Sequence, residues 1–492
     1  MNKQKLTYAL GIAAFLGSAA FAAPAFADGT AVAGNGAFSG SQVQTNSNSS
    51  TNANQTNNTQ ATNTVNTNNN TGNNSADFNT GGSVSINTGS ANAQVGISNT
   101  AGSNVAQVSG GSNGGQNTTV AGNGAFSDTN ASANSSNNTS LNQTNNTNFT
   151  NSVNTSNNTG KNSADFNTGS NVNINTGNAN AWVGIQNTAG SNQAAVSGGG
   201  SGNGTGTNTT VAGNGAFSDN NVSANSSNKT SLSQTNNTNF TNWVNTSNNT
   251  GKNSADFNTG GSVSINTGDA NAWVGISNTA GQNVGFVSGG GSSGGGGSIA
   301  VIGNGAFSNN NVSERNVMKT ALTQQNLTYV ANYVNTMNNT GNNTASFNTG
   351  NDVNITTGNA NAGVNIFNTA GSNEGYVVSP STYANAAEVA ILGNGAFSYN
   401  SVNASQYNKT SVNQKNHTMF YNSVNTKNNT GNNKSNYGTG SYMPFYMSSS
   451  NCGCSTQNGY GYSSGMSGLY SGSANAGVGM YNLASSNRLS SY

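Results

Sequence analysis

The residues best suited to chemistry are few in this sequence of 492 residues. Its only thiols, Cys452 and Cys454, are separated by one glycine, and its only histidine is His417. Two cysteines this close pair badly with each other, so disulfides between chains or contact with a soft metal are the chemistry they offer. No nucleophile can be matched with a base and no carboxylate pair recurs, so we expect neither an enzyme nor a bound cofactor or metal.

The two cysteines lie in a segment unlike the rest of the chain. An insertion of about 24 residues falls between Gly440 and Ala474, and we assign residues 441–473 to it. We interpret the segment as a flexible adhesive or cross-linking loop, and the alternative is an insertion with no role. Its large side chains are Met443, Phe445, Tyr446, Tyr460, Tyr462 and Tyr470.

Three acidic residues recur at one repeat position. Asp77, Asp165 and Asp256 share it, and later copies carry Ser346 and Asn436 there. A column of carboxylates offers oxygen ligands for Ca²⁺, but Ca²⁺ takes six to eight oxygens with several carboxylates. The sequence therefore favours a solvated turn at this position.

The three tryptophans are candidate surface contacts. Trp182 and Trp273 share a position that tolerates very different residues in the other copies, so we expect it to face outwards. With Trp243, these side chains could stack on a sugar or on a neighbouring molecule, and ordinary surface packing is the alternative. The other residues at the Trp182 position are Gln94, Gly363 and Gly477.

The organisation of the chain is set by a repeat. The hexapeptide Gly-Asn-Gly-Ala-Phe-Ser begins at five positions about 90 residues apart, so one unit is written five times. We divide the chain into a leader, 1–27, and five repeats, 28–117, 118–208, 209–298, 299–387 and 388–492. The third and fifth residues of the hexapeptide are predicted turn or core positions: Gly36, Phe38, Gly124, Phe126, Gly215, Phe217, Gly305, Phe307, Gly395 and Phe397.

Each repeat has the pattern of β-structure. Apolar and small polar residues alternate in Val84–Asn87, Val172–Asn175 and Val263–Asn266, as in half-buried strands. No proline occurs between Pro24 and Pro380, which suits a continuous hydrogen-bonded ladder. We therefore predict an all-β fold, a repetitive β-solenoid or stacked array of β-arches.

The size of one rung is harder to predict. Spacings near 40, 30 and 20 residues separate Phe217, Phe257, Val287 and Phe307, and these are multiples of about ten. One strand with its turn has about that length, so we expect about four rungs of two or three strands in every repeat. Gly-rich junctions are either loops of one continuous solenoid, which the matched spacing favours, or hinges between blocks.

A single repeat cannot bury enough to stand alone. Burying its few large apolar residues cannot offset the conformational entropy that is lost when its backbone becomes ordered. Backbone and Asn side-chain hydrogen bonds between repeats must supply the difference. The end rungs would be unpaired edges, and no charged or proline-rich cap is visible at the N-terminal end.

Export is indicated by the start of the chain. Lys3 and Lys5 precede an apolar run that ends at Ala25-Phe26-Ala27, the pattern of a cleaved secretory signal. No later stretch approaches the roughly 18 apolar residues of a membrane helix.

Only 5% of the residues are charged, and ten basic and eleven acidic residues follow the leader. Such scattered charges do not suit nucleic acid, and low charge with abundant Asn favours self-association.

The repeat phrases resemble those of known fibre subunits. The segments 72–78, GNNSADF, and 102–108, GSNVAQV, resemble the repeats of curlin, and 183–192 resembles those of Fap-type bacterial functional amyloids. The resemblance implies a secreted subunit that forms or decorates an extracellular fibre or cell-surface layer, in a biofilm or in attachment. Its partners would be other copies and a surface anchor or glycans. Fap-type subunits carry a Cys pair near the C-terminus with two intervening residues, where this chain has one.

A monomeric protein is the alternative class. The phrase that begins at Asn66, Asn154, Asn245, Asn335 and Asn425 would align threonines if the repeats superpose, as on an ice-binding solenoid, although a hydrogen-bonded turn is the simpler interpretation. Dense Asn-x-Thr sequons arise by chance in such a composition. The alternative is thus a monomeric β-solenoid adhesin that binds glycans or ice.

Overall fold

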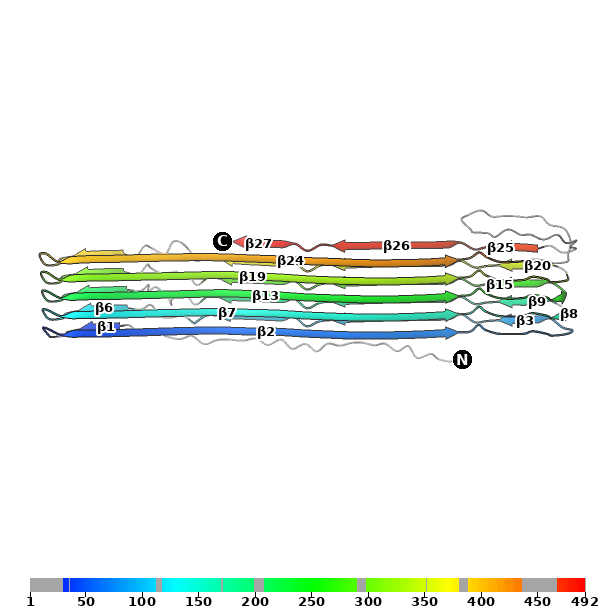
Figure 1. The fold of residues 1–492 in the computed structure, drawn as a ribbon, viewed down its shortest axis with the longest axis horizontal. Helices are drawn as coiled ribbons and strands as arrows, with labels where there is room; N and C mark the ends of the chain where they lie inside the picture. The colour runs from blue at the N-terminus through cyan, green and yellow to red at the C-terminus, as the bar shows by residue number, and fades with distance from the viewer. Residues whose placement is uncertain are drawn as a thin grey trace.

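The protein is a flattened coil in which each repeat makes one complete turn and lies on the repeat before it (Figure 1). The computed structural model describes residues 30–34, 36–111, 117–169, 171–198, 208–289, 298–350, 352–379, 388–435 and 467–491. The predicted leader, Cys452 and Cys454 lie outside these residues, as does most of every Gly-rich junction. The described residues contain no helix long and apolar enough to span a membrane.

One side of the coil is a single sheet of very long strands. Each of its five strands has 31 residues, so the sheet is about 100 Å wide. The order in the stack is the order in the chain: β2 (Gly40–Asn70), β7 (Asp128–Asn158), β13 (Asp219–Asn249), β19 (Asn309–Asn339) and β24 (Tyr399–Asn429).

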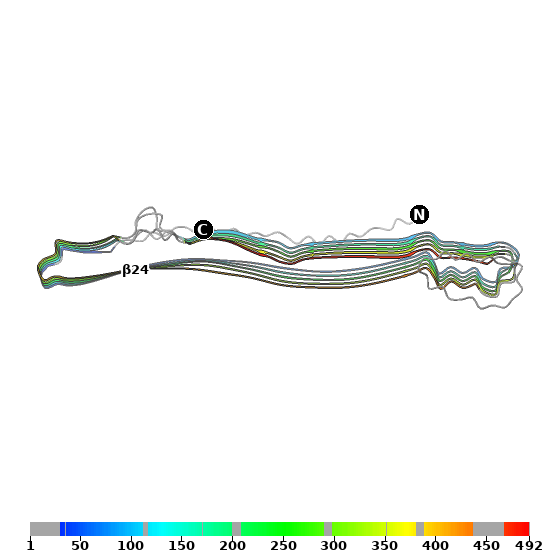
Figure 2. The ribbon, with the colours of Figure 1, turned by 90° about the horizontal axis from the view of Figure 1, so that it is seen from above.

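The chain returns along the other side in shorter strands, so that two layers face each other and are joined at both ends by turns (Figure 2). The first sheet of this layer contains β3 (Val84–Asn87), β9 (Val172–Asn175), β15 (Val263–Asn266), β20 (Val353–Thr356) and β25 (Ser467–Tyr470). The second contains β4 (Ala91–Thr100), β10 (Ala179–Thr188), β16 (Ala270–Thr279), β21 (Ala360–Thr369) and β26 (Ala474–Leu483). The third contains β5 (Asn104–Ser109), β11 (Asn192–Ser197), β17 (Asn283–Ser288), β22 (Asn373–Val378) and β27 (Asn487–Ser491). The fourth, which precedes the hexapeptide turn, contains β1 (Thr30–Ala33), β6 (Asn117–Ala121), β12 (Asn208–Ala212), β18 (Ser298–Ile302) and β23 (Glu388–Leu392). A short pair, β8 (Thr168–Gly169) and β14 (Thr259–Gly260), lies before β9 and β15.

All strand pairs are parallel, and equivalent residues lie directly over one another. Asn63 pairs with Asn151, Asn151 with Asn242, and Ala179 with both Ala91 and Ala270. This register confirms the predicted all-β stacked array. The strands on both sides of each junction continue the same sheets, so the repeats form one solenoid and are not separate blocks.

The prediction of about four short rungs per repeat is wrong, because one repeat is one rung. The 40-residue spacing between Phe217 and Phe257 corresponds to strand β13 with the turns at its two ends. The ten-residue increments therefore mark successive points along one wide coil. Stacking like residues on like requires the rung to be as long as the repeat.

The hexapeptide positions are turn positions. Phe217 has a left-handed φ of 58° and is 50% exposed, so this column of phenylalanines is not part of the core. The rings stack face to face, with centroids 4.9 Å apart between Phe38 and Phe126. Gly215 is required by the stacking itself, since an added Cβ would lie 2.3 Å from the backbone N of Ala125 in the rung below.

The core consists of columns of apolar side chains and columns of amides between the two layers. Val95 and Ile97 of β4 pack with Val153 of β7, and the equivalent residues of the next repeats extend the cluster as far as the partly buried Val424 of the last one. Phe149 and Phe240 are fully buried and stack 5.4 Å apart. The core is therefore continuous along the stack and is cut only at its two ends.

The last repeat carries its extra residues before β25. Thr344 pairs with Lys434, 90 residues on, whereas Val353 pairs with Ser467, 114 residues on, so 24 additional residues lie between Lys434 and Ser467. Ser467–Tyr470 is thus a strand of the sheet. The predicted C-terminal limit of the insertion, which included Tyr470, is too late.

Candidate functional site

The backbone hydrogen bonds give the stack a direction. The N–H of Thr71 donates to the carbonyl of Asn158 in the rung above, at 2.8 Å, while the N–H of Asp128 donates to Ser39 in the rung below, at 2.9 Å. In a parallel strand the groups of alternate residues point to opposite neighbours. We call residues inward when their side chains face the core between the two layers, and outward when they face solvent. The backbone groups of inward residues therefore bond towards the C-terminal end of the stack, and those of outward residues bond towards the N-terminal end.

This alternation leaves two chemically different edges. Among the described residues, β2 and β24 are the outermost strands of their sheet. At β2 the outward residues direct their N–H and C=O groups away from the stack, and at β24 the inward residues do so. Unpaired strand edges of this length are strong sites for adding a further strand.

The apolar columns are also open at both ends. Val43, Ala53 and Val65 are only partly buried where the columns reach the N-terminal rung. Val402, Val412 and Val424 end the same columns at the C-terminal rung and are likewise partly buried. Covering either end with a further rung would bury this surface.

Buried amides form ladders with a single polarity. Along one inward column the Nδ2 of each Asn donates to the Oδ1 of the next, towards the C-terminal end, at 2.7–2.8 Å. A facing column on the opposite layer does the same, at 2.7–2.9 Å. The first column is Asn63, Asn151, Asn242, Asn332 and Asn422, and the second is Asn99, Asn187, Asn278, Asn368 and Asn482.

The two ladders also bond across the core. Asn151 Nδ2 donates to Asn187 Oδ1 at 3.1 Å, and Asn187 Nδ2 donates to Asn242 Oδ1 at 3.1 Å. Both side-chain N–H groups of an internal Asn are therefore used. These inward amides were not singled out from the sequence, and their presence in all five repeats was the signal that could have identified them.

Outward amides form ladders of the opposite polarity. Asn249 donates to Asn158 and Asn158 donates to Asn70, each at 2.7 Å and towards the N-terminal end. Asn425 donates to Asn335 at 3.0 Å in the same sense. The side chains thus repeat the directionality of the backbone on both faces of the sheet.

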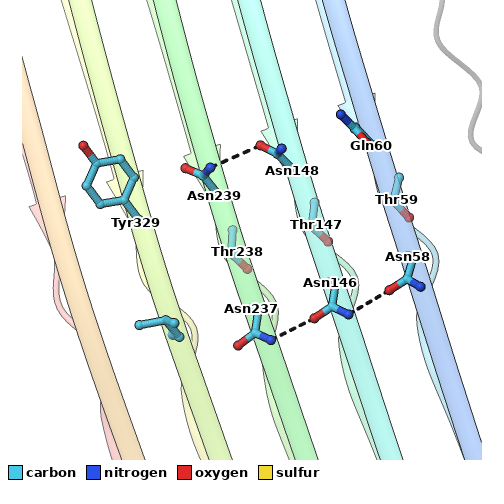
Figure 3. Close-up of a pocket in the computed structure, with 11 residues that line it drawn as sticks. Asn58, Thr59, Gln60, Asn146, Thr147, Asn148, Asn237, Thr238, Asn239 and Tyr329 are labelled. Carbon is cyan, nitrogen blue, oxygen red and sulfur yellow. Dashed lines mark hydrogen bonds between the residues drawn. The ribbon is translucent and has the colours of Figure 1, made fainter.

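A groove of about 500 Å³ crosses the outer face of the long sheet (Figure 3). Asn146 donates to Asn58 at 2.7 Å and Asn237 donates to Asn146 at 2.8 Å along one wall. Leu327 and Tyr329 of β19 continue the lining. Amides beside an aromatic ring are suited to bind the hydroxyls and faces of sugars.

The predicted surface tryptophans do lie at the surface. Trp182 and Trp273 are 57% and 45% exposed and adjacent in one column, with ring centroids 6.0 Å apart. Trp243 is half exposed and stacks on Tyr333 at 4.0 Å. The hexapeptide phenylalanines differ from these tryptophans, because each internal ring is stacked on both faces by the rings of the neighbouring rungs. Only the edges of these internal rings are left for a ligand to contact.

The recurring aspartates are held by the neighbouring rungs. Asp77 Oδ1 accepts the backbone N–H of Asp165 at 2.7 Å and the hydroxyl of Ser163 at 2.8 Å. Burial opposes ionisation of Asp77, but these hydrogen bonds and one from Ser75 outweigh it and lower its pKa. The carboxylates are thus used as acceptors between rungs, in half-buried turns.

The aligned threonines face inwards, which contradicts the ice-binding interpretation of their phrase. Thr155 and Thr246 pair in register and are fully buried, as are Thr159 and Thr250. Thr159 donates its hydroxyl to Gly177 at 2.8 Å. A buried column cannot present a flat array of hydroxyls to ice.

His417 lies on the exposed face of β24 and pairs in register with Leu327. No group of three His, Cys, Asp or Glu side chains that could hold a metal occurs in the described part of the chain. The features that the structure does bring together are the open strand edges, the cut core and the polar amide ladders at each end. No protein-family profile matches the sequence, and no curated protein or solved structure is detectably similar to it.

Proposed function

We propose that this chain is a secreted structural subunit that assembles end to end into, or decorates, an extracellular fibre or cell-surface layer. The observation that carries the proposal is the open stack: β2 and β24 each end a sheet with a 31-residue edge, above and below a continuous core. No catalytic role is proposed. Biofilm matrix and surface attachment are the settings that such a fibre suits.

The physical reason is that the stacked rungs of one molecule have the architecture of a short piece of fibril. Its rungs are held by the same parallel, in-register ladders that stack identical chains in fibrils. Adding a copy would bury both cut faces of the core and satisfy the edge N–H and C=O groups. Charged or proline-containing edges normally prevent such growth. Strand β2 has neither a charged residue nor a proline, and the three lysines of β24, Lys409, Lys415 and Lys427, lie on its outer face, where an added β2 would bring no like charge.

Assembly can be tested with the mature chain and an edge-blocking variant. Thr62 faces outwards on β2, so its N–H points to the open edge, and Thr62→Pro removes no backbone hydrogen bond between the residues that the structure describes. We expect the parent and Thr62→Ala to form fibres visible by electron microscopy, with diffraction near 4.7 Å along the axis. Thr62→Pro should fold, by circular dichroism, and remain unassembled. A parent chain that stays monodisperse at high concentration would refute the proposal.

A monomeric glycan-binding adhesin is the second candidate, favoured by the groove beside Leu327 and Tyr329. It predicts saturable binding of an oligosaccharide by the monomer. Tyr329→Ala should weaken that binding, whereas Tyr399→Ala, an exposed aromatic in the next rung outside the groove, should not.

A further inference from the structure

We infer that copies join in one direction only, with the N-terminal rung of one copy seated in register on the C-terminal rung of the next. The inference rests on the proposed assembly and specifies its interface. The occupant of each open end is therefore the opposite end of a second copy of this chain. The resulting fibre is polar and has two different growing ends.

Backbone complementarity gives the first argument. Between any two neighbouring rungs, inward residues of the lower rung bond to outward residues of the upper rung. The N–H of Thr340 donates to the carbonyl of Asn429 in the rung above, and the N–H of Tyr399 donates to the carbonyl of Ser308 in the rung below. The edge of β24 offers the first kind and the edge of β2 the second. Turning one copy over to join two like ends would either reverse the strand direction or exchange the two layers, so equivalent columns would no longer meet.

The amide ladders give the second argument. Asn63 Oδ1 would accept from Asn422 Nδ2 of the copy below, which continues the inward ladder. On the outer face the donor and acceptor roles are reversed, and Asn66 of the upper copy would donate to Asn425 Oδ1, which continues the outward ladder. Both opposed polarities are preserved only when unlike ends meet.

The side chains at the two ends match column by column. Val402 would lie under Val43 and Val424 under Val65, so each cut apolar column would close. Gln414 would meet Gln55, a residue type that fills this column in all five rungs.

The column of hexapeptide phenylalanines also ends at the two outer rungs. Phe38 and Phe397, at the two ends, are 78% and 82% exposed, against 49–51% for the three internal rings. Each end ring has one face that no described aromatic ring covers. Seating Phe38 of one copy on Phe397 of the next would continue the stack and cover both faces.

The direction can be tested by disulfide cross-linking within fibres. Thr56 and Lys415 are exposed, outward residues at opposite ends of one column. Within a molecule they are four rungs, about 19 Å, apart, too far for a disulfide, which needs Cα atoms within about 7 Å. Across the inferred junction they would be about 4.8 Å apart. The experiment uses Thr56→Cys with Lys415→Cys, in a chain whose two cysteines are replaced by serine.

Fibres of the double variant, oxidised and then dissolved in denaturant without reductant, should give a ladder of covalent oligomers. Each single variant should stay monomeric, and an equal mixture of the two should stop at dimers. Double-variant fibres without covalent oligomers, or single-variant fibres that form dimers, would overturn the inferred direction while leaving assembly intact. Should these cysteines prevent assembly, the equivalent pair Ser50→Cys with Lys409→Cys applies the same test. A parent without fibres would refute the proposed function instead.

Discussion

Asn151 donates its side-chain N–H to Oδ1 of Asn242 across 2.8 Å, at a place where both side chains are completely shielded from water. Asn242 also accepts from Asn187 and donates to Asn278 and Asn332. Asn242→Ala would strand these partners in the core, and we expect a loss of about 2–4 kcal/mol in the free energy of unfolding. Denaturant unfolding of the chain in the non-assembling Thr62→Pro background measures it.

The matched control is Asn245→Ala. Asn245 donates to Asn154 at 2.9 Å in an outward ladder that is exposed to solvent. Water can replace the lost partner, so we expect a change of about 0.5 kcal/mol or less. Equal losses in the two variants would show that burial of the inward ladder is not what stabilises the stack.

Thr246 offers a stabilising substitution. Its hydroxyl is shielded from solvent and has no hydrogen-bond partner among the described residues. The same holds for the hydroxyls of Thr155 and Thr336. Thr246→Val keeps the shape and removes the cost of burying the hydroxyl, so we expect a gain of about 1 kcal/mol. Thr279→Val, at an exposed position of β16, should change little, and a destabilised Thr246→Val would contradict the assigned environment.

The exposed phenylalanine column combines strain with stacking. Phe217 holds a left-handed φ of 58° and stacks on Phe126 and Phe307 at 4.9 and 5.0 Å. Phe217→Ala should lose the stacking and keep the strain, while Phe217→Gly should lose the stacking and relieve the strain. We expect the Gly variant to be the more stable of the two by about 1 kcal/mol, measured by thermal unfolding. The reverse order would mean that the backbone is not strained.

Glu314 should make stability depend on pH. It replaces the alanines of the equivalent column, Ala133, Ala224 and Ala404, and its Oε2 is shielded and has no partner among the described residues. Burial raises the pKa of Glu314 to about 7 from 4.5. The folded state therefore holds this proton more tightly than the unfolded state does, and stability should fall as the pH rises from 4.5 to about 7. Unfolding midpoints measured across this range should be less pH-dependent in Glu314→Ala. An unchanged pH dependence in this variant would show that another group causes it.

The stacking of repeats could be predicted from the sequence because it depends on like residues recurring at one spacing. The turns were also visible, since Asn-Gly in the hexapeptide indicates a tight turn. The surface position of Trp182 followed from the unrelated residues that replace it.

The 31-residue strands could not be predicted in the same way. Along β7 the apolar residues are few, although all of them lie on the inward face, and Asn with Ser or Thr occupies both faces, as at Asn151 and Ser152, so the apolar alternation is too sparse to predict one strand of 31 residues. Burial of Asn151 depends on the facing ladder that contains Asn187, 36 residues away. Within one strand, Asn151 and Thr155 share the face of the apolar Val153 and Asn154 does not, but this parity could be used only once the 31-residue strand was known, so the inward orientation of Thr155 was missed.

The mass per unit length of the fibre tests the account most directly. If one repeat is one rung and copies stack end to end, each chain of 49.3 kDa, less its predicted leader, adds five rungs of about 4.8 Å. Unstained scanning transmission electron microscopy should then give about 2 kDa per Å for a single filament. A value near 0.5 kDa per Å, as expected for rungs of 20–30 residues, or a chain that never forms filaments, would contradict it.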